Sequence, residues 1–336
     1  MSTAPPPTTM PAYPDRSTRL IVVGIIQVLL GCLCGLMAVL MVAVNSMGQM
    51  AKPPQAQPMN TATMIQVMVI YLSLAVTLIW LGIGLARARR WAWTLTVLLS
   101  WIWLIIGAIA FVTVVFFMGN AWEGVAQQGK LPPGALMAMR ITAGSVVAFI
   151  YILLPAVFLL LCQHESVRAT CRRKDPKIRW TDRCPMPVLA LSILLAWSIV
   201  SMSSLVAYRC VVPLFGVIIS GAAGAVAILL IVLVLAWLAW GTYRLQRAAW
   251  WGTLLLGVVG TVNTVVTFSR IDLMTFYEKM GMPADQLEMI RKMGVAEFMS
   301  HGGLWMAIAG GAVWVGYLLS VRRYFVRSGE AMNATS

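Results

Sequence analysis

The chain of 336 residues is too apolar for an ordinary soluble protein. Hydrophobic residues make up 60% of it and charged residues 11%, whereas soluble domains average about 45–50% and about 25%. The formal net charge of +14 falls on the connections between long apolar stretches. This pattern excludes a nucleic-acid-binding surface as the main reason for the charge and predicts an integral membrane protein with basic loops.

Eight stretches without Asp, Glu, Lys or Arg are long enough to cross the hydrocarbon core of a bilayer, which takes about 20 helical residues. We therefore predict an all-α integral membrane protein with eight transmembrane helices. The first stretch is also too long for the apolar segment of a signal peptide. The expected cores are Leu20–Val44, Met64–Leu85, Trp91–Met118, Ile141–Cys162, Pro187–Ala207, Leu214–Gly241, Ala248–Phe268 and Gly303–Leu319.

The chain divides into two halves of four helices each. Residues 1–18 are rich in Pro and Thr and are expected to form a disordered tail. The first half spans 19–183 and ends in a polar loop at 163–183, the second spans 184–327, and 328–336 form a C-terminal tail. Pro155 is expected to kink the fourth helix or to leave a carbonyl free there.

A block of twenty residues, 80–99, recurs at 237–256, and ten of the aligned positions are identical. A shift of about half the chain is typical of a tandem duplication. The identical pairs are Trp80/Trp237, Leu81/Leu238, Gly84/Gly241, Arg87/Arg244, Arg90/Arg247, Ala92/Ala249, Trp93/Trp250, Thr96/Thr253, Leu98/Leu255 and Leu99/Leu256.

The duplication and the distribution of charge together predict the topology. Because each half has an even number of helices, both insert the same way up, as parallel repeats. One side of the membrane receives 17 basic and 5 acidic residues, and the other receives 8 basic and 6 acidic residues. The basic side is expected to be cytoplasmic, which places both the N-terminus and the C-terminus inside.

The duplicated block lies at the basic turn between the second and third helices of each half. Arginine there can reach lipid phosphates while tryptophan sits at the depth of the headgroups. We interpret the block first as a membrane anchor and packing motif, and second as a binding motif. The residues expected at the lipid interface are Arg87, Arg90, Trp91, Trp93, Arg244, Arg247, Trp250 and Trp251.

The eight apolar cores contain no ionisable Asp, Glu, Lys or Arg. Proton-coupled transporters usually keep such groups at membrane depth, so this pattern disfavours a proton-driven pump. Gln66 and Asn263 are candidate polar groups for a groove between the halves, or they form hydrogen bonds between helices. We find no motif for catalysis and assign no catalytic residue, so an enzymatic role stays open.

Four soft ligands lie in or beside the central loop: Cys162, His164, Cys171 and Cys184. Such residues can bind Zn²⁺, but the spacing lacks paired C-x-x-C motifs. A Cys171–Cys184 disulfide and free thiols are the alternatives. His164 and His301 are expected at opposite faces of the membrane, which argues against a shared haem. No cofactor is therefore predicted, with zinc left as an alternative.

The central loop contains the most distinctive local sequence, with Val-Arg-Ala-Thr-Cys at 167–171 and Trp-Thr-Asp-Arg-Cys-Pro at 180–185. These segments resemble those of uncharacterised bacterial multi-pass inner-membrane proteins. The resemblance covers the loop and its flanking helices. It implies a bacterial inner-membrane location and no particular activity.

Three functions remain open at this stage. The favoured one is a non-catalytic structural or accessory subunit of a membrane assembly, which binds lipids with anionic headgroups and other membrane subunits or copies of itself. The alternative is a transporter or a lipid- or small-molecule-binding protein that uses the groove between the repeats. The third is a metal-handling enzyme or sensor built on the cysteine loop.

Overall fold

The computed structural model describes residues 15–50, 61–129, 133–282, 284–292 and 295–333. Its first half contains α1 (Ser17–Met50), α2 (Thr61–Ala86), α3 (Arg90–Gly129), α4 (Pro133–Ala148), the π-helix η1 (Phe149–Leu153), α5 (Leu154–Cys162), α6 (Glu165–Lys174) and the 3₁₀-helix η2 (Trp180–Asp182). The second half contains α7 (Met186–Ser204), η3 (Leu205–Tyr208), β1 (Val212–Leu214), β2 (Val217–Ile219), α8 (Gly221–Tyr243), α9 (Arg247–Arg270), α10 (Leu273–Lys279), α11 (Ala284–Lys292) and α12 (Val295–Asn333).

Eight helical segments in this described part of the chain are long and apolar enough to cross a membrane, which confirms the predicted class of multi-pass helical membrane protein. The fourth runs continuously through α4, η1 and α5. The segments are Ser17–Val44, Val67–Ala86, Arg90–Ile109, Ile141–Cys162, Met186–Tyr208, Gly221–Tyr243, Arg247–Arg270 and Gly303–Val326.

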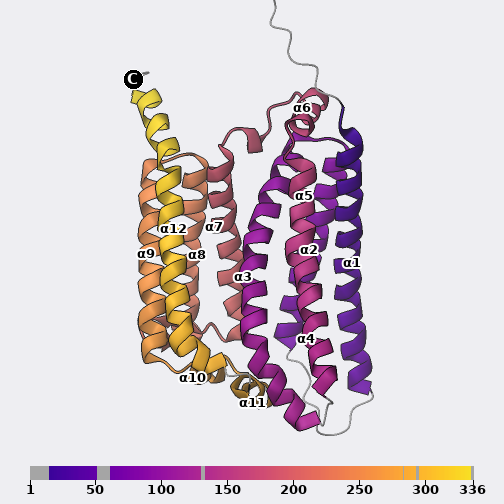
Figure 1. Cartoon of the computed structure of the whole chain (residues 1–336). Helices are drawn as coiled ribbons and strands as arrows, with labels where there is room; N and C mark the ends of the chain where they lie inside the picture. The colour runs from indigo at the N-terminus through magenta and orange to yellow at the C-terminus, as the bar shows by residue number, and fades with distance from the viewer. Residues whose placement is uncertain (1–14, 51–60, 130–132, 283, 293–294, 334–336) are drawn as a thin grey trace, which may run out of the picture.

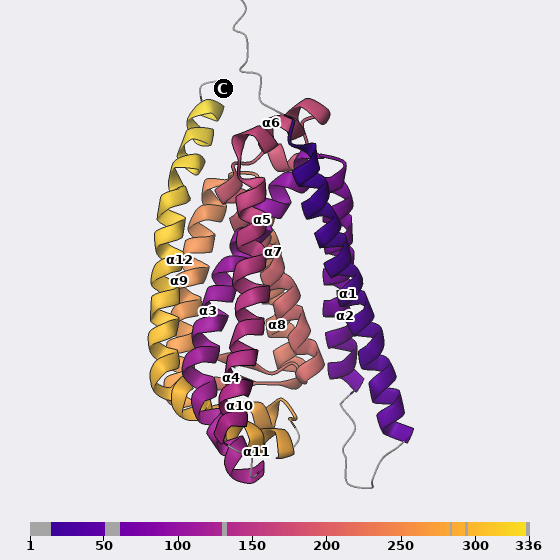
Figure 2. The same cartoon turned by 45° about the vertical axis from the view of Figure 1, so that its right-hand side comes forward.

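The helices of the two halves stand side by side, with α3 of the first half next to α7 of the second (Figure 1). The start of α1, the short helix α6 and the end of α12 all lie at one end of the bundle. We call this the basic end, because the arginine-rich turns lie there. The helices α10 and α11 lie at the opposite end (Figures 1 and 2).

Each half has its own buried apolar cluster near the basic end. In the first half Leu20 of α1, Leu85 of α2 and Phe158 of α5 are almost completely buried. In the second half Val188 of α7 and Leu318 of α12 are buried in the same way. Leu98 of α3 belongs to this second cluster, so α3 links the two halves.

The sixth span begins later than the sequence predicts. We expected it from Leu214, but β1 and β2 form an antiparallel hairpin there, with Leu214 opposite Val217, and α8 begins at Gly221. Phe215 and Gly216 have φ angles of 46° and 85°, as a two-residue hairpin turn requires. An apolar run alone does not separate a strand from a helix, which explains the error.

The fourth span contains a π-helical turn next to Pro155. The π-helical turn η1 directly precedes Leu154 and Pro155. Pro155 lacks an N–H, so the carbonyl of Tyr151 loses its usual helical donor. Gly107 of α3 lies against this carbonyl, where an added Cβ would collide with the Tyr151 oxygen. The Tyr151 carbonyl therefore lies at a close contact between α3 and the fourth span.

Several boundaries differ from the expected ones. Helix α1 begins at Ser17, inside the expected tail 1–18, and residues 1–14 lie outside the described part of the chain. Helix α12 continues to Asn333 through most of the expected tail 328–336. The short helix α11 begins at Ala284, and Pro283 before it lies outside the described residues.

Helices α1 and α2 pack closely because glycine faces glycine. A Cβ added at Gly82 would lie 2.6 Å from the carbonyl oxygen of Gly24, and one added at Gly24 would lie 2.6 Å from that of Gly82. Without side chains the two backbones approach directly, as small residues allow in membrane helices.

Gly82→Ala is expected to lower the free energy of unfolding by about 1–3 kcal/mol, because the new methyl group must push α1 and α2 apart. The measurement is an SDS-unfolding titration followed by circular dichroism. Gly316→Ala is the control, since a Cβ there would meet nothing within 4 Å. A Gly82→Ala variant as stable as this control would contradict the close contact.

Candidate anion-binding site at the basic end

The turn between α2 and α3 reverses the chain within a few residues. Ala88 adopts a left-handed conformation with φ of 50°, and the backbone N–H of Arg89 donates to the carbonyl of Gly84 at 2.9 Å. This bond satisfies a carbonyl at the end of α2 in the manner of a Schellman motif. A Cβ at Gly84 would lie 2.7 Å from the Cβ of Ala92, so this reversal depends on the glycine.

The turn between α8 and α9 has the same geometry at the corresponding positions. Leu245 has φ of 59°, and the N–H of Gln246 donates to the carbonyl of Gly241 at 2.9 Å. A Cβ at Gly241 would lie 2.7 Å from the Cβ of Ala249. The identical glycines and alanines of the duplicated block therefore occupy equivalent contacts in both turns.

The duplicated tryptophans tie the third helix of each half to the last one. The indole N–H of Trp93 donates to the carbonyl of Cys162 at 2.9 Å. The indole N–H of Trp250 donates to the carbonyl of Leu318, also at 2.9 Å. Arginine lies over each ring, with Cζ of Arg168 5.8 Å from the centre of Trp93 and Cζ of Arg322 5.7 Å from that of Trp250.

The two halves diverge immediately after this hydrogen bond. In the first half α5 ends at Cys162 and a new helix, α6, starts at Glu165. The Nδ1 atom of His164 lies 2.8 Å from the Ser166 hydroxyl and accepts from the Ser166 N–H, which caps α6. In the second half α12 continues past Leu318 without a break. The first half therefore gains a short helix that turns away from α5.

Trp93→Phe is expected to cost about 1–3 kcal/mol of unfolding free energy, because the carbonyl of Cys162 lies at the end of α5 and loses its donor. Trp250→Phe is expected to cost about 0.5–1.5 kcal/mol, since Leu318 lies inside α12 and its carbonyl keeps a helical donor.

Paired SDS-unfolding titrations of the two variants give this comparison directly. Both substitutions remove the same N–H and keep an aromatic ring, so each is the matched control for the other. An equal loss, or a larger loss for Trp250→Phe, would contradict the role of Trp93 as a cap of α5.

Ion pairs hold the central loop against the first turn. Asp175 is only 3% exposed in its side chain, and its carboxylate lies 3.8 Å from Arg89 and 3.7 Å from Arg179. Asp182 lies 3.3 Å from Arg90 and accepts the backbone N–H of Arg179 at 3.0 Å. From the second half, the Tyr243 hydroxyl donates to the carbonyl of Trp180 at 3.0 Å.

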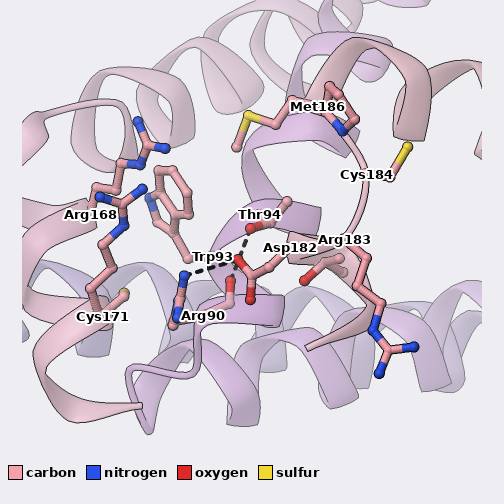
Figure 3. A pocket seen from close by; sticks show the side chains of 12 residues that line it. Arg90, Trp93, Thr94, Arg168, Cys171, Asp182, Arg183, Cys184 and Met186 are labelled. Atoms are coloured by element: carbon pink, nitrogen blue, oxygen red, sulfur yellow. Dashed lines mark hydrogen bonds and ion pairs between the residues drawn. The ribbon is translucent and has the colours of Figure 1, made fainter. Parts of the chain in front are cut away.

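A pocket of about 430 Å³ lies where the loop meets α3. This volume is within the range of small-molecule sites, about 300–1,000 Å³. In Figure 3 Arg168 reaches from α6 toward the Trp93 ring, and Arg90 faces Asp182 beside it, while Arg183 points away. The lining residues are Arg90, Trp93, Thr94, Arg168, Cys171, Arg172, Thr181, Asp182, Arg183, Cys184, Pro185 and Met186.

The pocket is electropositive, because four arginines and one carboxylate line it. Thr181 is 2% exposed, and its hydroxyl oxygen has no hydrogen-bond partner. Burial raises the pKa of the Cys171 thiol to about 12 and that of the Cys184 thiol to about 11. Both cysteines therefore stay uncharged at neutral pH and add no negative charge to the lining.

The corresponding residues of the second half make different contacts. Arg247 corresponds to Arg90, but it donates to the backbone carbonyl of Val326 at 3.1 Å. Trp251 corresponds to Thr94 and is 61% exposed. A bulky indole thus stands where the first half has a small hydroxyl, and α12 has no break that would place a second wall opposite it.

The residues expected at the lipid interface fall into different environments. Arg87 and Trp251 are exposed, Trp91 stacks on Trp80 with ring centres 4.1 Å apart, and Arg244 lies over Trp240 at 4.8 Å. Arg90 and Arg247 make the contacts given above.

Trp93 and Trp250 are buried inside the helix bundle. They are only 8% and 4% exposed, because their indole N–H groups bind backbone carbonyls inside each half.

Asn263 binds the β-hairpin at the end opposite the pocket. Its side-chain oxygen accepts the N–H of Phe215 at 2.6 Å, and its amide donates to the carbonyl of Pro213 at 3.2 Å. Both polar ends of this side chain therefore hold a turn in place. The side chain of Gln66, the other candidate for a groove, lies outside the described part of the chain.

The four candidate zinc ligands do not form one cluster. Cys162 and Cys171 are buried in the apolar cluster of the first half, and Cys184 is buried in that of the second. His164 caps α6 through Nδ1. Among the described residues no group of three or more His, Cys, Asp or Glu side chains is arranged to hold a metal, and Cys171 and Cys184 are free thiols rather than a disulfide.

Sequence reasoning named Arg90 and Trp93 of this pocket, and Cys171 and Cys184 as candidate zinc ligands, but missed the other residues of its opposite walls. Arg168, Arg172, Thr181 and Asp182 lie in the central loop segment, which the sequence marked only as basic and distinctive. The i, i+4 spacing of Arg168 and Arg172 places both on one face of a helix, and this signal was available from the sequence.

No protein-family model, curated protein or solved structure matches the chain. The site therefore has to be interpreted from its own chemistry.

Proposed function

We propose that this protein is a non-catalytic membrane protein that binds anionic lipid headgroups in the pocket between α3, α6 and the start of α7. The single observation that carries the proposal is the pocket itself, with its excess of arginine and a buried, unpartnered Thr181 hydroxyl. Arginine matches phosphate geometry through paired N–H donors. Trp93 and Met186 provide apolar surface for the adjoining glycerol and acyl carbons.

The proposal includes the topology expected from the sequence. The two halves are parallel four-helix repeats, and the equivalent turns and tryptophan contacts support this interpretation. The basic end faces the cytoplasm of a bacterial inner membrane, with both termini inside, in keeping with the charge distribution and with the resemblance of the central loop. In this orientation the pocket lies at the depth of the inner-leaflet headgroups.

The test measures lipid binding by native mass spectrometry in a neutral detergent, with dioctanoyl phosphatidylglycerol and dioctanoyl phosphatidylcholine as probes. The wild-type protein is expected to retain the anionic lipid at least about tenfold more tightly, because each well-placed arginine–phosphate contact contributes about 1–3 kcal/mol. The double variant Arg168→Gln/Arg172→Gln is expected to lose this preference.

The matched control is Arg322→Gln/Arg323→Gln, which removes the same charge from the corresponding helix of the second half. This control is expected to keep the preference for the anionic lipid. An equal loss in both double variants would mean that general surface charge attracts the lipid, and would contradict the pocket as the site.

A second candidate function is that of an accessory subunit in a larger membrane assembly. It is favoured by the low burial of the last two spans, in which only 11% of each apolar window is buried, against 50% in the third span. This leaves a wide helical surface for a partner subunit or a second copy. Purification in a mild detergent with no protein partner and no self-association would contradict it.

A further inference from the structure

We infer that the pocket selects a terminal phosphomonoester over a phosphodiester, and that Asp182 sets this selectivity. The inference rests on the proposed binding of anionic headgroups and adds the chemical class of the ligand. It follows from three features of the lining: the excess positive charge, the ion pair that Asp182 already forms with Arg90, and the Thr181 hydroxyl that has no hydrogen-bond partner.

The net positive charge of the lining favours a ligand with more than one negative charge. Arg90, Arg168 and Arg172 line the pocket together with a single carboxylate, that of Asp182, which leaves an excess of two positive charges, while Arg183 points away (Figure 3). A phosphodiester carries one negative charge, whereas a phosphomonoester carries about 1.5 to 2 at pH 7 and has three terminal oxygens. The monoester therefore neutralises more of the charge of the site.

Asp182 already forms an ion pair with Arg90, an arginine that a bound anion would otherwise contact. Its Oδ1 lies 3.3 Å from Arg90, and its Oδ2 accepts the N–H of Arg179 at 3.0 Å. An incoming diester has the same charge as this carboxylate and gains little by replacing it on Arg90. A monoester carries a higher charge and a third oxygen, so it can share Arg90 and still reach Arg168 and Arg172 on the facing helix.

Thr181 provides a neutral donor for the remaining oxygen. Its side chain is almost completely buried, its oxygen has no partner, and it lines the pocket next to Asp182. A buried hydroxyl without a partner has an energetic cost that a bound anion would remove. The wall that carries the competing carboxylate thus also carries a donor for the ligand.

Among the described residues, the corresponding positions of the second half do not reproduce this lining. Arg247 binds a backbone carbonyl, and Trp251 replaces the small Thr94. The selectivity should therefore come from one pocket for each chain, with a stoichiometry of one strongly bound monoester.

The experiment compares dioctanoyl phosphatidic acid, a monoester, with dioctanoyl phosphatidylglycerol, a diester, by native mass spectrometry of the full chain in a neutral detergent. The wild-type protein is expected to bind phosphatidic acid about tenfold more tightly. Asp182→Asn is expected to raise the affinity for phosphatidylglycerol several-fold, so that the ratio falls toward one. The asparagine oxygen can still accept the N–H of Arg179, so the turn is kept.

Asp15→Asn is the control, because it removes one negative charge at the basic end from an exposed side chain that pairs with Lys174 outside the pocket. This variant is expected to keep the wild-type ratio. Competition by inorganic phosphate would identify soluble phosphate esters as ligands. Bound phosphatidic acid that resists inorganic phosphate would identify the lipid, and either result upholds selection of a monoester.

Equal affinity for the two anionic lipids in the wild-type protein would overturn the inference and leave the proposed function standing. An unchanged ratio in Asp182→Asn would remove the assigned role of Asp182. No preference for either anionic lipid over phosphatidylcholine would instead contradict the proposed function itself.

Discussion

The hydrogen bond from the Trp93 indole to the carbonyl of Cys162 is the contact on which the basic end of the first half depends. It joins α3 to the last residue of α5, where a helix would otherwise leave a carbonyl without a donor. Because α5 can end there, the chain turns at His164 and α6 folds over the Trp93 ring. The same bond at Trp250 holds α9 to the middle of α12, and no second wall forms. The same tryptophan hydrogen bond therefore leads to a second pocket wall in the first half, where α5 ends, and to none in the second half, where α12 continues.

The pocket results from this break together with the ion pairs of the central loop. Asp175 and Asp182 bind arginines of the α2–α3 turn, so the loop that connects the two halves lies against the first of them. Tyr243 holds the same loop from the second half. Contacts from both halves therefore hold the central loop that lines the pocket.

The sequence predicted the spans well because the constraint behind them is strong. A charge-free run of more than 20 residues has few alternatives to a membrane helix. The hairpin at Val212–Ile219 was missed because its strands lie inside such a run. The carbonyl partners of Trp93 and Trp250 were not predicted, because the average enrichment of tryptophan at headgroups does not indicate a specific hydrogen bond. The pocket was only partly predictable, since its walls come together through ion pairs between residues far apart in the sequence, such as Arg90 and Asp182.

The most direct measurement is an electron cryomicroscopy structure of the protein in nanodiscs that contain phosphatidic acid. The account predicts phosphate density in the first half alone, bounded by Arg90, Arg168 and Thr181, with no counterpart beside Arg247 and Trp251. A pocket filled only by ordered water, or lipid phosphates distributed equally over the two basic turns, would contradict it.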